Sequence, residues 1–249
     1  MYHFYTEKSN ISDGYITIYG EDVNHIKNVL RMSVGEEVII CDGEGVDYHC
    51  SIEGFDKDCI KAEILENGIS EAELPFRIWL FQGLPKKDKM ELIIQKNVEL
   101  GVYKIVPVMT RRVIVKLDDK KKEERKLERW QAISESAAKQ SGRGLIPEIC
   151  PVMSFSDALK ALSELDCAVI PYENADSSEQ GIKNTRAIIE GFKDKKNIGI
   201  FIGPEGGFDP EEVEKAMLAG VTPVTLGKRI LRTETAGMMV LSVAGFLSV

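Results

Sequence analysis

The sequence has few of the features that mark an exported or membrane-bound protein. Its 249 residues include only five cysteines, an odd number, and no Cys-x-x-Cys pair. The first residues, MYHFYTEKSNISDG, lack the apolar stretch of an export signal. The longest apolar tract, residues 237–249, is shorter than the roughly 20 residues of a membrane-spanning helix. We therefore expect reduced thiols, a cytoplasmic location and no membrane association.

The usual motifs for metal and phosphate binding are also missing. Cys41, Cys50 and Cys59 are evenly spaced, but a zinc site normally has paired short spacings and a fourth ligand. We therefore predict no metal site and place these cysteines on strands. No Walker loop and no G-x-G-x-x-G turn of a dinucleotide site occurs. The three histidines have no partners that would indicate a Ser/His/Asp triad.

The net charge of −8 is unevenly distributed along the chain. Residues 1–70 contain 5 Lys/Arg and 14 Asp/Glu, a net charge of −9, whereas residues 82–145 contain 16 basic and 9 acidic residues, a net charge of +7. A local basic excess attracts phosphate groups whatever the total charge of the chain. The run 120–122 is interpreted as a solvated helix start. The other basic residues of interest are Lys86, Lys87, Lys89, Arg111, Arg112, Lys116 and Arg143.

Residues 1–72 are predicted to form a small β-rich domain. Five strand-like segments alternate with turn signals: YHFYT, YITIYG, EEVIICDGEG, VDYHCSIEGF and CIKAEILENG. One helix, VNHIKNVLR, is expected to begin after Asp22 as its N-cap. A polar stretch that ends at Pro75 marks the boundary to the second domain, residues 73–249.

Strand-like apolar runs alternate with helical patterns in residues 73–249. This alternation predicts an α/β domain with a mainly parallel sheet. The strand-like runs are FRIWLFQG, KIVPVM, CAVIPY, NIGIFIG and TPVTLG. The clearest helix signals are Asp209 as N-cap, Pro210 at the first helical position and Gly220 as the stop.

Two glycine-bearing segments follow strands near the end of the chain, IGPEGGF (202–208) and LGKRILRTETA (226–236). Glycine lets a ligand approach the backbone, and parallel sheets bind ligands at the carboxyl ends of their strands. Thr233 or Thr235 is expected to cap the last helix. Each segment alone is also an ordinary turn, but together they predict a ligand pocket.

Four blocks carry a family resemblance: GLPKKDKMELIIQKNVELGV (83–102), AAKQSGR (137–143), IGPEGGF and LGKRILRTETA. They resemble the signature blocks of the 16S rRNA uridine N3-methyltransferases, within the trefoil-knot (SPOUT) methyltransferase superfamily. The resemblance covers nearly the whole chain. It implies a PUA-like RNA-binding domain, a knotted α/β domain, S-adenosylmethionine as cofactor, 16S rRNA of the small ribosomal subunit as substrate, and a homodimer.

The resemblance also implies where the cofactor and the chemistry lie. Uracil N3 carries a proton, so methyl transfer requires that something removes it or stabilises charge on the flanking carbonyl oxygens. Glu205 and Arg232 are the candidate catalytic residues, with a bond to loop amides and an ion pair to Glu234 as their respective structural alternatives. The implied cofactor contacts are Gly203, Pro204, Glu205, Gly206, Gly207, Leu226, Gly227, Ile230, Leu231 and Thr233.

Candidate RNA contacts are basic residues from both predicted domains, because arginine and lysine bind phosphates and arginine also stacks on bases. They are Lys27, Arg31, Lys86, Lys87, Arg112 and Arg143. Two other functions stay open: a knotted methyltransferase that acts on tRNA or another RNA base, and a non-catalytic RNA-binding or ribosome-assembly protein. Cofactor titration separates an enzyme from a binder, and nucleoside analysis identifies the modified base.

Overall fold

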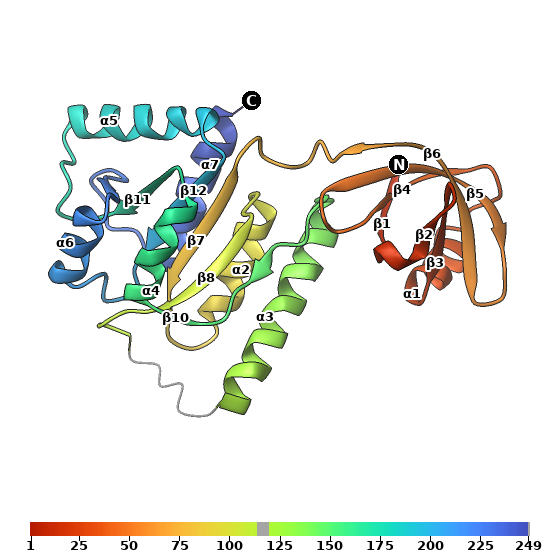
Figure 1. Cartoon of the computed structure of the whole chain (residues 1–249), viewed down its shortest axis with the longest axis horizontal. Helices are drawn as coiled ribbons and strands as arrows, with labels where there is room; N and C mark the ends of the chain where they lie inside the picture. Colours follow the sequence, from red (N-terminus) through yellow and green to blue (C-terminus); the bar gives the residue numbers. More distant parts are fainter. Residues whose placement is uncertain (114–119, 249) are drawn as a thin grey trace. The chain divides into compact units, whose positions relative to one another are not determined.

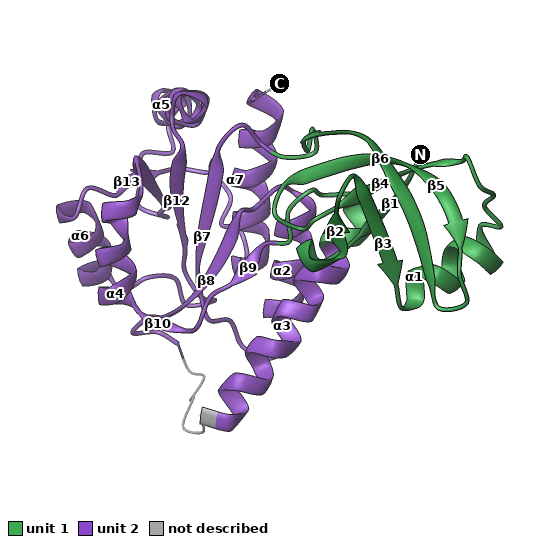
Figure 2. Cartoon of the chain, turned by 45° about the vertical axis from the view of Figure 1, so that its right-hand side comes forward, with its two compact units in different colours: residues 1–73, 138–146 green, residues 74–137, 147–249 purple. Residues whose placement is uncertain are grey.

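The structure is a computed structural model and describes residues 1–113 and 120–248. Lys116, one of the basic residues noted above, lies outside the described residues. The chain divides into two compact units (Figure 2). The first comprises residues 1–73 and 138–146, and the second comprises residues 74–137 and 147–249. The sequence placed residues 138–146 with the second domain, so their membership of the first unit is a finding of the structure.

The first unit is built on a six-stranded sheet with the order β1-β4-β5-β6-β3-β2. The β1–β4 pair is parallel and the other four pairs are antiparallel. Alternate residues of these strands, among them Ile16, Ile18, Val38 and Ile40, are buried on one side and form the core. This arrangement confirms the β-rich N-terminal part. The strands are β1 (Tyr2–Tyr5), β2 (Ile11–Ser12), β3 (Tyr15–Tyr19), β4 (Glu37–Cys41), β5 (Val46–Phe55) and β6 (Cys59–Ile69).

The helix of the first unit differs from the sequence expectation. It consists of a short α-helix, α1 (Glu21–Asn24), that widens into a π-helix over His25–Val29. The residue before the helix is Gly20, with φ 76° and ψ −141°, so the prediction of Asp22 as N-cap was wrong. Glycine adopts this backbone conformation without strain. Asp22 instead lies in the first turn, a position where acidic residues interact favourably with the helix dipole.

The second unit contains a sheet with the order β10-β8-β7-β12-β11-β13, and β9 also pairs with β8 (Figure 1). All of its pairings are parallel. The predicted α/β class with a mainly parallel sheet is therefore confirmed. The strands are β7 (Arg77–Gly83), β8 (Lys104–Met109), β9 (Glu148–Ile149), β10 (Met153–Ser154), β11 (Cys167–Pro171), β12 (Asn197–Ile202) and β13 (Thr222–Val224).

Helices cover both faces of this sheet, with α4 and α6 on one side and α2 and α7 on the other (Figures 1 and 2). Trp79 and Phe81 of β7 pack in one core cluster with Phe155 of α4 and Val213 of α6. Leu80, which lies between Trp79 and Phe81 in β7, is near Gly237 of α7 on the opposite face of the sheet. The helices are α2 (Lys89–Glu99), α3 (Lys120–Ser141), α4 (Phe155–Lys160), α5 (Glu179–Glu190), α6 (Pro210–Leu218) and α7 (Thr233–Leu247).

The last two helices begin in different ways. Asp209 is the N-cap of α6, Pro210 is the first helical residue, and Gly220 has φ 97°, as the sequence predicts. The structure adds a capping box between Asp209 and Glu212. The N-cap of α7 is Arg232, which makes no side-chain cap bond, so the expectation of a Thr233 or Thr235 cap was wrong. Thr233 uses its hydroxyl elsewhere. Among the described residues, no helix is long and apolar enough to cross a membrane.

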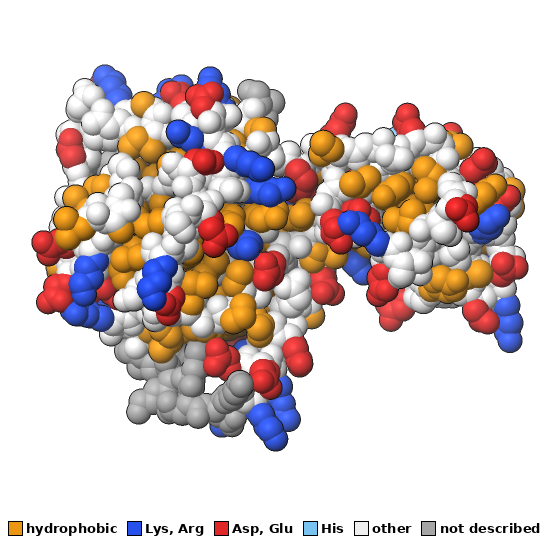
Figure 3. All heavy atoms as spheres, in the orientation of Figure 1, with side chains coloured by type: hydrophobic (Ala, Val, Ile, Leu, Met, Phe, Trp, Pro, Cys, Tyr) orange, Lys and Arg blue, Asp and Glu red, His pale blue; other side chains and the backbone are white. Residues whose placement is uncertain are grey.

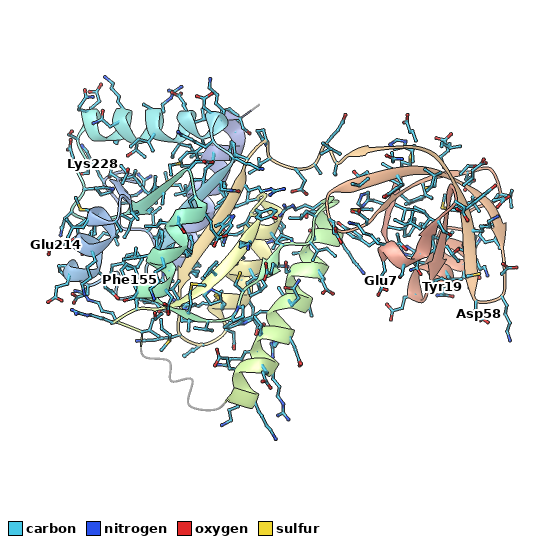
Figure 4. All side chains as sticks on the ribbon, viewed as in Figure 1. Glu7, Tyr19, Asp58, Phe155, Glu214 and Lys228 are labelled. Atoms are coloured by element: carbon cyan, nitrogen blue, oxygen red, sulfur yellow. The ribbon has the colours of Figure 1, made fainter. Side chains whose placement is uncertain are left out.

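The capping box of α6 leads to a test of stability. Asp209→Ala is expected to lower the free energy of unfolding of the second unit by about 1 kcal/mol, because it removes the acceptor for the first amides of the helix. Trp79 and Trp130 are both buried in this unit, so tryptophan fluorescence during urea unfolding measures the change. Glu214→Ala, an exposed position on the same helix (Figure 4), is the control and is expected to change little. Equal unfolding midpoints for Asp209→Ala and the control would contradict the capping role.

Candidate functional site

A cleft of about 490 Å³ lies at the carboxyl ends of β11, β12 and β13 in the second unit. Three segments of chain line it, residues 171–173, 202–208 and 225–233, together with Lys89, Ser177 and Ala236. The two glycine-bearing segments of the sequence therefore face one space. The cleft lining includes Gly203, Pro204, Glu205, Gly206, Gly207, Leu226, Gly227, Ile230, Leu231, Arg232 and Thr233.

The first glycine segment is a tight turn in which close contacts constrain Gly203 and a positive φ constrains Gly207. A Cβ added to Gly203 would lie 3.0 Å from the carbonyl carbon of Gly207, and Gly207 itself has φ 66°. The amide of Gly207 donates to the carbonyl oxygen of Pro204 at 2.9 Å, which closes the turn. A Cβ at Gly83 would lie 2.7 Å from Cδ of Pro204, so β7 also approaches the turn closely. These contacts leave bare backbone along one wall of the cleft.

Gly206 lies against the side chain of Arg112. A Cβ at Gly206 would meet Cβ of Arg112 at 3.4 Å, and Nη1 of Arg112 donates to the carbonyl oxygen of Gly206 at 2.7 Å. Arg112 therefore supports the glycine turn with its stem and with its guanidinium.

A buried hydrogen-bond chain holds the second glycine segment against the first. The hydroxyl of Thr233 donates to the carbonyl oxygen of Gly203 at 2.6 Å, and Nε2 of Gln82 donates to the same hydroxyl at 2.8 Å. Gln82 is fully buried at the end of β7, and Thr233 is also buried. The chain joins the ends of β7 and β12 to the first residue of α7, which explains why Thr233 does not cap its own helix.

Glu205 is a charged residue of the cleft that contacts the segment at the start of α2. Its carboxylate accepts a hydrogen bond from the amide of Lys86 at 3.1 Å and lies 3.1 Å from Nζ of Lys89. Partial burial alone would raise the pKa of Glu205, but the hydrogen bonds from its own amide, Lys89 and the Lys86 amide outweigh this effect and hold the pKa below its ordinary value. Glu205 is therefore a carboxylate at neutral pH, and its low pKa makes it a weak proton acceptor.

Arg232 lies at the cleft with an exposed side chain. Its carbonyl oxygen accepts from the amides of Thr235 and Ala236 at 2.9 and 3.0 Å, so the start of α7 fixes its backbone. In the described parts of the chain, its guanidinium pairs with no acidic residue. Glu234, the expected alternative partner, lies 3.5 Å from Nζ of Lys89 instead. Arg232 is thus free to contact a ligand.

Comparison with known proteins identifies the family. The family model described as an RNA methyltransferase domain matches residues 72–245, and the model described as an RNA methyltransferase PUA domain matches residues 18–65. The chain belongs to this family of RNA methyltransferases. The matches extend over both halves of the sequence, so they include the strands that frame the cleft and most of the first unit's sheet.

Individual relatives align over nearly the whole chain. Ribosomal RNA small subunit methyltransferase E of Bacillus subtilis is 39% identical over 231 residues, which cover 92% of this chain and 89% of that protein. Its namesake from Mesomycoplasma hyopneumoniae is 33% identical, with 97% and 98% covered. Among solved structures, the Neisseria gonorrhoeae enzyme of that name, bound to S-adenosylmethionine, has a TM-score of 0.79 at 34% identity, with 99% and 98% covered. A Legionella pneumophila methyltransferase with the same bound cofactor has a TM-score of 0.75 at 30% identity, with 97% and 96% covered.

The sequence did not indicate the third lining segment of this methyltransferase, Pro171–Glu173. The amide of Tyr172 donates to the carbonyl oxygen of Val224 at 3.0 Å, which places the end of β11 beside the end of β13. The strand CAVIPY was predicted, but the order of strands in the sheet was not. Lys89 was noted only as part of a basic region. Lys89 follows a predicted strand and lies at the start of a helix, and this position was the available signal that it could line the cleft.

The six candidate RNA contacts lie in different environments. Lys86 and Lys87 are exposed before α2, and Arg112 is partly occupied by the glycine turn. In the first unit Arg31 is exposed and Lys27 is half-buried, and Nζ of Lys27 donates to the carbonyl oxygens of Asp56 and Lys57. In the view of Figure 3, acidic and basic side chains are interspersed on the surface, so no single basic face marks the RNA path there.

Arg143 departs from the expectation of an accessible RNA contact. Its side chain is only 3% exposed, and its guanidinium forms an ion pair with Glu73. Oε1 of Glu73 accepts from Nε of Arg143 at 3.2 Å and from the amides of Gly144 and Leu145 at 3.1 Å each. In this conformation the guanidinium holds residues 138–146 in the first unit and does not present itself to phosphate.

One group of potential metal ligands occurs among the described residues, and it lies in the first unit. It consists of His3, Cys41 and Asp47, with Nε2 of His3 at 3.4 Å from Oδ1 of Asp47. Burial raises the pKa of the Cys41 thiol to about 12, and this thiol donates to the carbonyl oxygen of Gly144. The cleft belongs to the second unit and shares no residue with this group.

Proposed function

We propose that this chain transfers the methyl group of S-adenosylmethionine to N3 of a uridine in the 16S rRNA of the small ribosomal subunit. The observation that carries the proposal is the cleft at the ends of β11, β12 and β13, which both glycine segments line. Relatives named ribosomal RNA small subunit methyltransferase E align over nearly the whole chain, which supports this assignment of substrate.

The cleft fits the proposed cofactor in size and chemistry. Its volume of about 490 Å³ falls within the usual range for small-molecule sites, roughly 300–1,000 Å³. Backbone at Gly203 and Gly227 and aliphatic side chains such as Leu226 and Leu231 suit a nucleoside, whose base is bound by backbone groups and apolar walls. When bound, the cofactor supplies an electrophilic methyl group on a positively charged sulfur. The ten residues proposed as cofactor contacts all face this cleft.

A residue of this chain is proposed to stabilise the negative charge that develops on the uracil ring. Arg232 has a free guanidinium at the cleft and is proposed to donate to a carbonyl oxygen beside N3 as that oxygen gains negative charge. The low pKa of Glu205 makes it a poor acceptor for the N3 proton. We therefore assign Glu205 to ordering the glycine turn, through the Lys86 amide and the Lys89 ammonium.

RNA is proposed to approach along the cations that surround the cleft. Lys86 and Lys87 are exposed, and Lys228 (Figure 4) and Arg229 are exposed residues of the cleft lining. Arg112 adds a guanidinium beside the glycine turn. Phosphate contacts of this kind supply much of the affinity for RNA and weaken with added salt.

Residues 1–72 are proposed to act as an RNA-binding domain, and residues 73–249 to carry methyl transfer. Because residues 1–70 have a net charge of −9, the RNA contact of the first domain is assigned to the area of Lys27 and Arg31. The match of a PUA model to residues 18–65, described for RNA methyltransferases, supports this role.

The chain end, the oligomeric state and the location complete the proposal. After β13 the chain returns along the cleft to α7, which packs against α2 and β12, and we propose that this path forms the trefoil knot. Leu92 of α2 and Phe246 of α7 are 44% and 83% exposed, and we propose that such apolar residues contact a second copy in a homodimer. The proposed location is the cytoplasm, where ribosomal subunits are found.

The proposed reaction predicts a defined product. Incubation of the protein with labelled S-adenosylmethionine and small ribosomal subunits that lack the modification is expected to transfer label to 16S rRNA. A methyl group on N3 blocks the Watson–Crick edge of uracil, so reverse transcriptase is expected to stop at one uridine. Digestion and nucleoside analysis then identify 3-methyluridine.

The same assay separates the alternatives. Transfer to tRNA, or recovery of a different methylated nucleoside, would replace the proposed substrate by another RNA. A protein that binds RNA but shows no saturable affinity for S-adenosylmethionine would be a binding or assembly protein. Absence of transfer to subunits and to naked 16S rRNA would overturn the proposal.

The closed glycine turn predicts a cofactor-binding defect. Gly203→Ala is expected to weaken S-adenosylmethionine binding by about tenfold or more, or about 1.4 kcal/mol, because the added Cβ would lie about 3.0 Å from the backbone of Gly207 and force the turn open. Calorimetric titration measures the affinity. Gly191→Ala is the control, since a Cβ there meets no atom within 4 Å. Unchanged affinity in Gly203→Ala would remove this turn from the cofactor site.

The free guanidinium of Arg232 predicts a separation of turnover from binding. Arg232→Ala is expected to lower kcat by about 100-fold, the usual effect of removing one donor to a developing oxyanion, with a much smaller change in cofactor affinity. Single-turnover methylation and cofactor titration measure the two quantities. A loss confined to cofactor affinity would instead make Arg232 a binding residue.

A further inference from the structure

Lys89, the first residue of α2, links two segments of the cleft that are far apart in the sequence. Its Nζ lies 3.1 Å from Oε1 of Glu205 in the glycine turn and 3.5 Å from Oε2 of Glu234 in the first turn of α7. Lys89 also belongs to the cleft lining. The ammonium group of Lys89 therefore links the start of α2 to the turn after β12 and to the start of α7.

The two carboxylates depend on this cation because they are partly shielded from water. The side chains of Glu205 and Glu234 are 26% and 15% exposed, and Oε2 of Glu234 is buried without a hydrogen-bond partner among the described residues. Glu205 has a second donor, the Lys86 amide, whereas residues 1–113 and 120–248 give Oε2 of Glu234 only the charge of Lys89. Charges in such surroundings interact more strongly than charges in open solvent.

We propose that Lys89 is a positioning residue for the cofactor site, whose ammonium bridges Glu205 and Glu234 and thereby fixes the spacing between the glycine turn and the start of α7. This inference rests on the proposed function, because the ligand that the spacing serves is S-adenosylmethionine. Without the cation, two carboxylates would repel each other across the cleft wall. The turn and α7 would then separate, although the Thr233 hydrogen bond would still join them at one point.

Another lysine of the same helix shows what distinguishes Lys89. Lys96 lies 2.8 Å from Glu99, three residues along α2, so this pair connects no separate segments. Partly exposed pairs within one helix contribute little to stability. The two contacts of Lys89 connect three elements that meet at the cleft. Their loss is therefore expected to change the shape of the cleft, whereas loss of the Lys96 pair affects only the surface of one helix.

The first test measures S-adenosylmethionine affinity by calorimetric titration of the full chain. Lys89→Met keeps the aliphatic stem and removes the charge, and it is expected to weaken binding about tenfold. Lys89→Arg keeps the charge and is expected to stay within about threefold of the original protein. Lys160→Met, which breaks an exposed pair with Asp157 on α4, is the control and is expected to leave affinity unchanged.

A second variant tests the charge logic itself. If repulsion between the carboxylates opens the cleft, Glu234→Gln added to Lys89→Met is expected to restore several-fold of the lost affinity. A lysine that serves only as the first residue of α2 would give no such recovery, because Glu234→Gln leaves that helix unchanged. Lys89→Met that binds like the original protein, or a loss that Glu234→Gln does not relieve, would overturn the inference.

The pH dependence of binding gives an independent measurement. Lys89 helps to hold the pKa of Glu205 down, so the carboxylate is lost only as the pH falls through that lowered pKa. In Lys89→Met the pKa of Glu205 rises, so its carboxylate is neutralised at a higher pH. Because neutralisation relieves the repulsion from Glu234, the variant is expected to regain affinity as the pH falls, whereas the original protein, which has no such repulsion to relieve, is expected to regain none. The other charged side chains of the cleft lining, Glu173, Lys228, Arg229 and Arg232, are unchanged in both proteins. Identical pH profiles would contradict the inference.

Failure of this inference is distinguishable from failure of the proposed function. If the original protein shows no saturable binding of S-adenosylmethionine, the proposed function is overturned and the bridge has no ligand to serve. If the original protein binds the cofactor and Lys89→Met binds it equally well, the proposed function stands and the role of Lys89 is rejected.

Discussion

The cleft depends on one buried hydroxyl group, that of Thr233, which makes two hydrogen bonds. This hydroxyl donates to the carbonyl oxygen of Gly203 and accepts from Nε2 of Gln82, so one side chain joins the ends of two neighbouring strands to the start of the last helix. Buried polar groups are costly unless they are paired, which makes this junction specific. Because residues 225–232 lie between β13 and Thr233, the junction also holds the second glycine segment along the cleft.

Local signals in the sequence were enough to find the parts of the site. Lys104–Met109 forms a strand over the residues predicted, because a short apolar run rich in β-branched residues favours a buried strand. Asp209 and Pro210 begin α6 because caps are local chemistry. The third segment, Pro171–Glu173, was beyond such reasoning, since its place in the cleft follows from β11 lying beside β13. Strand order is set by packing between distant segments, which no local pattern encodes.

The same limit explains why residue type alone did not indicate the partners of individual side chains. Thr233 has the residue type of a cap, but a buried carbonyl oxygen and a buried amide compete for its hydroxyl and decide its role. Arg143 has the residue type of an RNA contact, yet Glu73 and burial give it a partner within the first unit. Residue type states what a side chain can bind, whereas the tertiary structure decides which partner is within reach. Asp22 was misplaced for a simpler reason, because Gly20 supplies a backbone conformation that an aspartate adopts less readily.

The charge arrangement of the cleft bears on how the proposed reaction is achieved. The Lys86 amide and Lys89 hold the Glu205 carboxylate in place and lower its pKa, so Glu205 contributes little as a base. The exposed cations of the lining, Lys228, Arg229 and Arg232, pair with no carboxylate in the part of the chain that the structure describes, and they remain available. Positive charge near uracil stabilises the deprotonated ring and the developing oxyanion, and the same charge attracts phosphate. Phosphate contacts at the surface are screened by salt more strongly than a contact inside the cleft. One set of cations can therefore serve both binding and chemistry, and their dependence on ionic strength distinguishes the two contributions.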